Sequence, residues 1–341
     1  MDLEMLTQRS RLFASTRQFF DRRGYLEVDT PVLAPNLIPE TCLEVFETTY
    51  LRPPDSRSQS REQPYWLVPS PELWMKKLIA DHGKSIYQIS KCFRNGESVG
   101  RIHSPEFTML EFYTLEADYR DSIEITEDLW RALMTSETAK DLRPPFLRIS
   151  MEEAFQKWAG FSLYGAVEEG TLRLVAEARR LGLDPPAWLS LGDLYNLIFV
   201  HTVEPSLPRD TPVVLMDYPA FVPCLAKTLP GGQAKERWEL YARGVELANC
   251  YSEETDAEEV RRYFMREGEE KRKEALVPHR MDEDYWRTFL PRRGVDSENF
   301  APFPRCSGVA LGMDRLLMVL TGRSTIDSVL PFPMDEVQDR F

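Results

Sequence analysis

The chain has 341 residues, of which 43% are hydrophobic and 11% aromatic, which is enough apolar material for one large core. Its formal net charge of -13 argues against general affinity for nucleic acids, because phosphate contacts depend on lysine and arginine. No apolar run approaches the roughly 20 residues of a membrane span, and the first residues do not resemble a signal peptide. Five scattered cysteines without a CxxC pair argue against a disulfide framework or a zinc site and favour a cytoplasmic protein.

The first part of the chain predicts a helix, a short strand, a loop and a second helix. Residues 5–23 place apolar side chains at helical spacing, and Gly24 supplies a stop. The segment YLEVDTP predicts a short strand that ends at Pro31. The polar stretch 51–64 predicts an exposed loop, and SPELWMKKLIADHG predicts a helix that Ser70 can cap.

The remaining strands and helices are mixed along the chain. Strand patterns occur at IYQIS, FTMLEFY, VVLM, RWELYARGVELAN and CSGVALG, and helical patterns at 121–139, 171–182, 192–203 and 256–275. Because several strands are adjacent in sequence, we expect an α+β fold with an antiparallel sheet flanked by helices. The stretch 142–208 predicts a helical insertion into an otherwise single domain.

A first segment with chemical potential is FRNGESVGRIHSPEFTMLEFY, residues 93–113. Two strands are joined by a turn that carries charged side chains in close succession, namely Arg94, Glu97, Arg101, His103 and Glu106. Such a loop suits a polyphosphate whose purine is read by a carboxylate and stacks on Phe107. A solvated charged hairpin is an equally consistent interpretation of the charges alone.

A second segment is RWELYARGVELANCYSEETD, residues 237–256. Strand alternation puts Glu239 and Glu246 on opposite faces, unless a bulge at Gly244 resets the phase. Carboxylates also crowd at Glu253 and Glu254, and acids that stay ionised so close together imply magnesium, an amine ligand or solvent. An acidic strand end in water is the alternative.

The third segment is CSGVALGMDR, residues 306–315. Gly308 and Gly312 leave the backbone bare where a flat ligand could lie, and Arg315, at the start of a helix, could reach distal phosphates. Strand glycines more often mark a bulge or tight packing. The three segments gain weight because they form an ordered set.

Together these segments resemble the catalytic domain of the class II aminoacyl-tRNA synthetases. RRGYLEVDTP resembles motif 1, which builds the dimer interface, FRNGE with HSPEFTMLE resembles motif 2, and GVALGMDR resembles motif 3. SPEL, MDYPAFVPCLAK and GVELANCYSEETD are similar to segments of lysyl-tRNA synthetases. Motif 1 begins almost at the N-terminus, so we expect no N-terminal OB-fold anticodon-binding domain. In this respect the chain resembles the elongation factor P beta-lysine ligase family, which adenylates a lysine-type amino acid with ATP and transfers it to a lysine of elongation factor P.

The resemblance implies roles for individual residues. Arg94 and Arg315 would be catalytic, Arg94 on the α-phosphate and the amino-acid carboxylate and Arg315 on the γ-phosphate. The expected ATP-binding set is completed by Glu97, Arg101, His103, Glu106 near the adenine amino group, Phe107 stacked on adenine, Glu239, Glu246 and Gly312. Glu239 and Glu246 would hold Mg2+. The expected amino-acid pocket comprises Ser70, Glu72, Glu111, Tyr113, Asn249, Glu253 and Ala310.

Two positions bear on substrate choice. Ala310 stands where lysyl-tRNA synthetases have glycine and the ligase family has alanine, so the resemblance implies that family's preference for beta-lysine over alpha-lysine. One methyl group discriminates by roughly 10- to 200-fold, which biases the choice without making it absolute. Cys250 stands where glycine is expected after Asn249, so its thiol could narrow the pocket.

Two other functions fit the same resemblance. One is a truncated lysyl-tRNA synthetase-like enzyme that charges tRNA or another carrier, and the other is a non-catalytic paralogue that acts as a regulator. A pure binder has no need of both arginines and both magnesium acids, which counts against the regulator. We expect a homodimer that modifies elongation factor P, with no tRNA binding and no membrane association.

Overall fold

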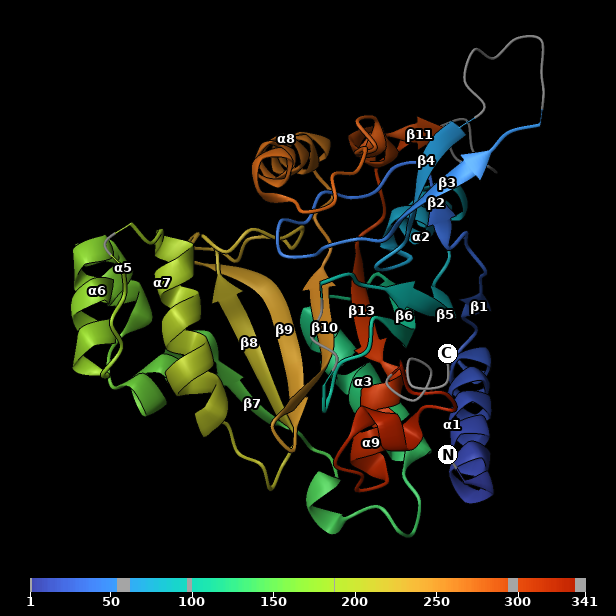
Figure 1. Cartoon of the computed structure of the whole chain (residues 1–341), viewed down its shortest axis with the longest axis horizontal. Coiled ribbons are helices and arrows are strands. Elements are labelled where there is room, and N and C mark those ends of the chain that lie inside the picture. Colours follow the sequence, from blue (N-terminus) through green and yellow to red (C-terminus); the bar gives the residue numbers. More distant parts are fainter. Residues whose placement is uncertain (1, 54–61, 97–99, 187, 294–299, 335–341) are drawn as a thin grey trace. The chain divides into compact units, whose positions relative to one another are not determined.

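The computed structural model describes residues 2–53, 62–96, 100–186, 188–293 and 300–334, which form two compact units (Figure 1). Unit 1 comprises Met1–Glu116 and Glu254–Phe341, and unit 2 comprises Ala117–Glu253. Each unit contains β-sheet and its own helices, which confirms the α+β class. Within the described ranges, none of the helices combines the length and the apolar character that crossing a membrane requires.

The sheet of unit 1 has the strand order β1-β5-β6-β13. β6 pairs antiparallel with both β5 and β13, as the sequence predicts, whereas the edge strand β1 pairs parallel with β5. The strands are β1 (Leu26–Glu27), β5 (Ile86–Phe93), β6 (Glu106–Leu115) and β13 (Cys306–Gly312).

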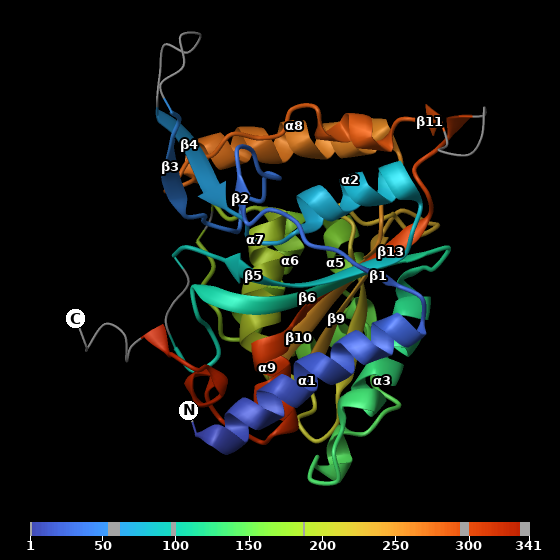
Figure 2. The ribbon, with the colours of Figure 1, turned by 90° about the vertical axis from the view of Figure 1, so that its right-hand side faces the viewer.

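Helix α1 (Leu3–Arg22) covers one face of this sheet, which we call the back face (Figure 2). The helix begins where Asp2 accepts the backbone N–H of Met5. The ring of Phe20 in this helix stacks on the ring of Tyr87 of β5, with 4.7 Å between the ring centroids. Its centroid also lies 4.9 Å from that of Phe112 of β6. Because side chains alternate along a strand, the neighbours of these two residues point to the opposite, front face.

The other elements of unit 1 pack around this sheet. The prediction of a loop over 51–64 is wrong for residues 62–64, which form part of β4 and pair with β3. Cross-strand pairing outweighs the turn-like composition of these residues. Residues 54–61 lie outside the described ranges. The elements are β2 (Leu33–Ala34), β3 (Glu47–Leu51), β4 (Glu62–Leu67), α2 (Glu72–His82), α8 (Ala257–Glu274), η5 (Tyr285–Phe289), β11 (Arg292–Arg293), β12 (Phe300–Ala301), α9 (Met313–Leu320) and η6 (Ile326–Val329).

The sheet of unit 2 has the order β10-β9-β8-β7, with β7 and β8 parallel and the other pairs antiparallel. β9 and β10 form a hairpin whose two turn residues, Arg243 and Gly244, both have positive φ, the conformation that a tight hairpin turn requires. The elements are α3 (Tyr119–Leu133), η1 (Lys140–Leu142), β7 (Leu147–Ser150), β8 (Val213–Pro219), β9 (Ala234–Ala242) and β10 (Val245–Ser252).

The predicted helical insertion occupies the connection between β7 and β8. It begins at Met151 instead of residue 142, because residues 147–150 pair with β8 as strand β7. The helices bury an aromatic cluster in which Tyr195 stacks on Phe155 and Phe199. The elements are α4 (Met151–Ala154), η2 (Phe155–Ala159), α5 (Leu163–Glu169), α6 (Thr171–Arg180), α7 (Leu191–Ile198), η3 (Phe199–Val203) and η4 (Glu204–Ser206).

Candidate active site

The front face of the unit 1 sheet carries a row of three residues on three neighbouring strands. Ala310 of β13 pairs in register with Glu111 of β6, and Glu111 pairs with Gln88 of β5. Gly308 and Gly312 flank Ala310 on the same face of β13, so this strand presents nothing larger than a methyl group there. The bare backbone lets a ligand approach the sheet closely beside a carboxylate.

Glu111 is held by two hydroxyl groups. Ser70 donates to one carboxylate oxygen at 2.8 Å and Tyr113 donates to the other at 2.7 Å, while the side chain is only 3% exposed. Burial raises the pKa of Glu111 to about 8, the nearby Glu72 adds to the rise, and the two hydrogen bonds oppose it. The nearby Lys76 also opposes the rise, and an ammonium ligand would act in the same direction.

Glu72 stands at the first turn of α2, close to Glu111. The N-cap residue of α2 is Pro71 instead of the predicted Ser70, but the backbone N–H of Glu72 still donates to the hydroxyl of Ser70 at 3.0 Å. The carboxylate of Glu72 forms a 2.5 Å ion pair with Lys76, whose side chain is 1% exposed. The helix thus supplies a buried cation next to two carboxylates.

Arg94 and Phe107 lie together at the far end of the front face. The guanidinium of Arg94 lies over the ring of Phe107, 5.3 Å from its centroid. Its buried Nε has no hydrogen-bond partner among the described residues. A buried guanidinium N–H without an acceptor fits a carboxylate or phosphate oxygen supplied by a ligand.

The motif 2 turn brings the other predicted cations into one region. Arg315 donates from Nε to the carbonyl of Ile102 at 3.0 Å, and Arg101 reaches the carbonyl of Ser324 at 3.4 Å. His103 pairs through its backbone with Gly100 across the same turn. These hydrogen bonds connect the turn to α9, so its cations lie in the same region as Arg315, where they could bind a polyphosphate together. Glu97 lies outside the described residues.

In unit 2, the hairpin of β9 and β10 places the two predicted magnesium acids on one face. The register between β9 and β10 shifts between Glu246 and Ala248, so Leu247 is the extra residue. Glu246 then pairs with Tyr241 and Asn249 pairs with Glu239. The prediction of opposite faces is wrong, because the turn at Arg243 and Gly244 splits the segment into two paired strands. Glu246 pairs with Tyr241, which shares a face of β9 with Glu239, and the bulge at Leu247 brings Asn249 to the same face.

The carboxylate of Glu239 is already engaged. It accepts hydrogen bonds from the hydroxyls of Tyr218 at 2.5 Å and Tyr241 at 2.7 Å, and it pairs with Arg237 at 2.5 Å. Within the described ranges, no group of three or more potential metal-ligating side chains forms a closed metal site. Two carboxylates on one face still fit Mg2+, which commonly completes its shell with water and substrate phosphates, but Glu239 would share its oxygens with these donors.

The remaining predicted residues of unit 2 lie along β10. Asn249 donates to the hydroxyl of Tyr251 at 3.0 Å, and its buried side-chain oxygen has no partner among the described residues. Glu253 is 2% exposed and bridges by its backbone to Ala226. Cys250 pairs with the buried Trp238 on the opposite face from Asn249, so its thiol does not narrow a pocket there.

Comparison with known proteins covers both units. The family described as tRNA synthetases class II (D, K and N) matches residues 3–336. An elongation factor P–(R)-beta-lysine ligase from Avibacterium paragallinarum is 33% identical over 98% of this chain and 96% of its own length. Proteins of the same name from Haemophilus influenzae (strain PittGG) and Proteus mirabilis (strain HI4320) are also 33% identical. The first match covers 98% of this chain and 96% of the relative, and the second 96% and 94%. The chain belongs to this ligase family.

One expected contact of the ligase is corrected by the fold. Glu106 and Phe107 are consecutive residues of β6, so their side chains point to opposite faces of the sheet. Glu106 forms an exposed ion pair with Lys91 at 2.8 Å, and both side chains point to the back face of the sheet. Glu106 is therefore not near an adenine stacked on Phe107.

Three further residues of the ligase join the site and escaped sequence reasoning. Gln88 is 2% exposed, and its side-chain oxygen has no partner among the described residues. Burial raises the pKa of Glu40 to about 7, with Glu72 adding to the rise and the cations Arg94 and Lys76 opposing it. The third residue is Lys76. Strand alternation from Arg94 back to Gln88 could have identified Gln88, and the i,i+4 spacing from Glu72 could have identified Lys76. Nothing in the sequence around Glu40 indicated its position.

Proposed function

We propose that this chain is an ATP-dependent ligase that adenylates lysine or beta-lysine and transfers it to a lysine side chain of elongation factor P. Family membership supports the reaction type, and the curated relatives are named as elongation factor P–(R)-beta-lysine ligases. The observation that carries the substrate class is the buried carboxylate of Glu111, which two hydroxyl groups hold in place, beside the methyl group of Ala310.

An ammonium group satisfies this carboxylate. Its positive charge favours the ionised form of Glu111, so binding of the amine and loss of the carboxyl proton are linked. Gln88 offers a second oxygen acceptor beside it, and Ala310 limits how deep a substrate can lie over β13. The amino groups of a diamino acid therefore have acceptors, while its carboxylate remains available at the Arg94 end of the face.

Activation then requires positioning and charge stabilisation. Class II synthetase-like ligases use ATP, typically with Mg2+. An oxygen of the amino-acid carboxylate attacks the α-phosphorus, the bond to the β-phosphate oxygen breaks, and pyrophosphate leaves. Arg94 neutralises the attacking carboxylate and the α-phosphate, and Arg315 holds the leaving phosphates, assisted by Arg101 and His103. Phe107 offers the ring on which adenine stacks.

In this proposal Glu239 and Glu246 hold magnesium together. The carboxylate of Glu239 also contacts Tyr218, Tyr241 and Arg237, and these contacts hold it in a fixed orientation toward the ion. Glu246 lies on the same face of the hairpin. When bound, Mg2+ neutralises the charge that develops on the leaving pyrophosphate.

The second step moves the acyl group to the acceptor. A neutral amine of the acceptor lysine attacks the acyl carbon, the bond to the AMP oxygen breaks, and the amine loses a proton as the amide forms. Cations near the adenylate, among them Arg94, favour the neutral form of an incoming lysine. The net charge of -13 supports a protein acceptor over tRNA.

The decisive experiment offers both acceptors at once. The enzyme is incubated with ATP, Mg2+ and labelled alpha- or beta-lysine in the presence of equal amounts of elongation factor P and total tRNA. Label on the protein is the expected result, and the preferred isomer identifies the natural substrate. Label on tRNA contradicts the proposal and supports a synthetase, and adenylate without transfer to either directs the search to another acceptor.

We place the active enzyme in the cytoplasm, where its substrates are, and propose that it is a homodimer. The support for a dimer is a set of exposed apolar side chains on α1, β1 and β2. Leu3 is 79% exposed and Leu26 56% exposed, and Leu6 and Leu33 are exposed as well. Exposed leucines on neighbouring elements are the usual signature of a surface that another chain covers.

A further inference from the structure

Asp314 connects the two elements that carry the ATP-contacting residues of unit 1. It is the second residue of α9, directly before Arg315, and it is 1% exposed. One of its oxygens accepts the backbone N–H of Thr108 at 2.6 Å. Because β13 ends at Gly312, opposite Met109, this N–H lies just beyond the last strand pair. The side chain of Asp314 thus links the start of α9 to β6 just beyond the last residue pair of β6 and β13.

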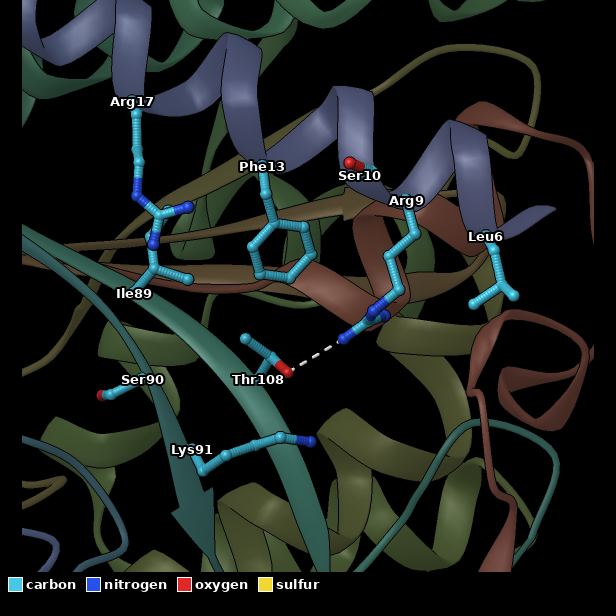
Figure 3. Close-up of a pocket in the computed structure, with 9 residues that line it drawn as sticks. All are labelled: Leu6, Arg9, Ser10, Phe13, Arg17, Ile89, Ser90, Lys91 and Thr108. Carbon is cyan, nitrogen blue, oxygen red and sulfur yellow. Dashed lines mark hydrogen bonds between the residues drawn. The ribbon is translucent and has the colours of Figure 1, made fainter. Parts of the chain in front are cut away.

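The positive partner of Asp314 comes from the other end of the sequence. Arg9 of α1 forms a 2.5 Å ion pair with the second oxygen of Asp314, and its other guanidinium nitrogen donates to the hydroxyl of Thr108 at 3.0 Å. It also reaches the carbonyl of Val329 in η6 at 3.3 Å. Figure 3 shows Arg9 extending from α1 toward Thr108 across a pocket of about 430 Å3.

The three elements that Arg9 contacts all border the phosphate side of the site. β6 carries Phe107, the neighbour of Thr108, and α9 carries Arg315. η6 begins at Ile326, whose backbone N–H donates to the carbonyl of Arg101 at 2.8 Å. A single guanidinium on the back face therefore contacts a side chain of β6, a side chain of α9 and a backbone carbonyl of η6.

We propose that Arg9 is a positioning residue for ATP, which acts through Asp314 and Thr108 to set the direction of Arg315 and Phe107. Consecutive residues of a helix point about 100° apart, so fixing Asp314 toward α1 fixes where Arg315 projects. A buried ion pair with three further hydrogen bonds has one geometry, and that geometry is transmitted through the first turn of α9. The inference rests on the proposed ATP-dependent function.

The test measures binding of a non-hydrolysable ATP analogue by calorimetry to the full chain and its variants. Arg9→Ala is expected to weaken binding at least tenfold, and Arg9→Lys to recover part of the loss because lysine reaches one acceptor at a time. Thr108→Val keeps the shape of the side chain and removes one acceptor, so a smaller loss of about threefold is expected. Arg17→Ala is the control, because Arg17 lines the same pocket but pairs with the exposed Glu27.

A second readout separates positioning from general loss of structure. In pyrophosphate exchange, the KM for ATP is expected to rise in Arg9→Ala while the KM for the amino acid stays within twofold. Equal rises in both constants, or binding of the analogue as tight as in the unchanged protein, would overturn the proposal. If Arg9→Ala does not fold or changes its assembly state by mass photometry, the Arg9→Lys and Thr108→Val variants decide by the same criteria. Failure of the unchanged protein to bind the analogue would instead contradict the proposed function.

Discussion

Ala310 lies in register with Glu111 across β13 and β6, so a methyl group borders the buried carboxylate that we assign to the substrate amine. Ala310→Gly removes this methyl and deepens the floor of the site by one carbon. We expect the preference between beta-lysine and alpha-lysine to move toward alpha-lysine by roughly 10- to 200-fold. The measurement is the ratio of kcat/KM for the two isomers, and an unchanged ratio would remove Ala310 from the choice of substrate.

The second prediction concerns the pH dependence of substrate binding. With a pKa of about 8, Glu111 is mostly protonated at pH 6.5 and must lose its proton to pair with an ammonium. The KM for the amino acid should fall as pH rises toward 8 and then level off. Glu111→Gln should bind the amino acid poorly and without this pH dependence. A flat KM between pH 6.5 and 8 in the unchanged enzyme would argue against Glu111 as the amine partner.

The same group affects stability without substrate. Its pKa is higher in the folded chain, about 8, than its ordinary value of 4.5 in the unfolded chain. Its contribution to the free energy of unfolding is therefore fully present below about pH 4.5 and is lost as pH rises through 8. Urea unfolding of the substrate-free enzyme should show a shallower fall of stability with pH in Glu111→Gln.

The third prediction separates the two magnesium acids. Glu239→Gln and Glu246→Gln should both lower adenylation, but Glu239→Gln should lower the melting temperature more. Glu239 is bonded to two tyrosines and Arg237, so its loss leaves a buried guanidinium without its counter-ion. Glu246→Gln should instead raise the Mg2+ concentration for half-maximal activity. Thermal unfolding and Mg2+ titration test this, and equal melting temperatures for the two variants would contradict it.

The fourth prediction concerns the buried ion pair of α2. Lys76→Met leaves the carboxylate of Glu72 without its partner, and breaking such a pair costs about 3 to 5 kcal/mol, with the lower end expected because Glu72 is 17% exposed. The neighbouring Lys77 pairs with Asp282 and is 32% exposed. Lys77→Met should therefore cost at most about 1 kcal/mol. Urea unfolding compares the two, and similar losses would mean that Lys76 is not a buried partner.

The fifth prediction tests the assembly. Leu26→Glu introduces a charge into the exposed apolar surface of α1, β1 and β2. If a partner chain covers this surface, losing the burial of a leucine on each chain, at about 1.5 to 3 kcal/mol per side chain, weakens the dimer by at least 100-fold. The control is Leu172→Glu on α6, where the leucine is 84% exposed. Mass photometry should show monomers for the first variant only, and dimers in both would place the interface elsewhere.

Much of the fold follows from local pattern. The helices at the N-terminus and at 257–274, and the strands at 86–93, 106–115 and 306–312, coincide with the periodicities that predict them. Hydrophobic period and end signals are properties of short stretches, which is why they survive into the folded chain. The 62–64 segment is the exception, because its strand exists only through pairing with β3.

The sequence by itself determined the family, the ordered motifs and most of the residues that line the site, because these depend on residue type and on spacing within a segment. Only the tertiary structure decided the environment of each group. The hairpin pairing of β10 with β9 placed Glu246 on the side of Glu239, and strand phase placed Glu106 on the back face. The pKa of Glu111 depends on burial and on Ser70, 41 residues away, and the occupancy of Glu239 depends on Tyr218. Desolvation and hydrogen bonding are set by neighbours that are distant in sequence, so no local pattern carries them.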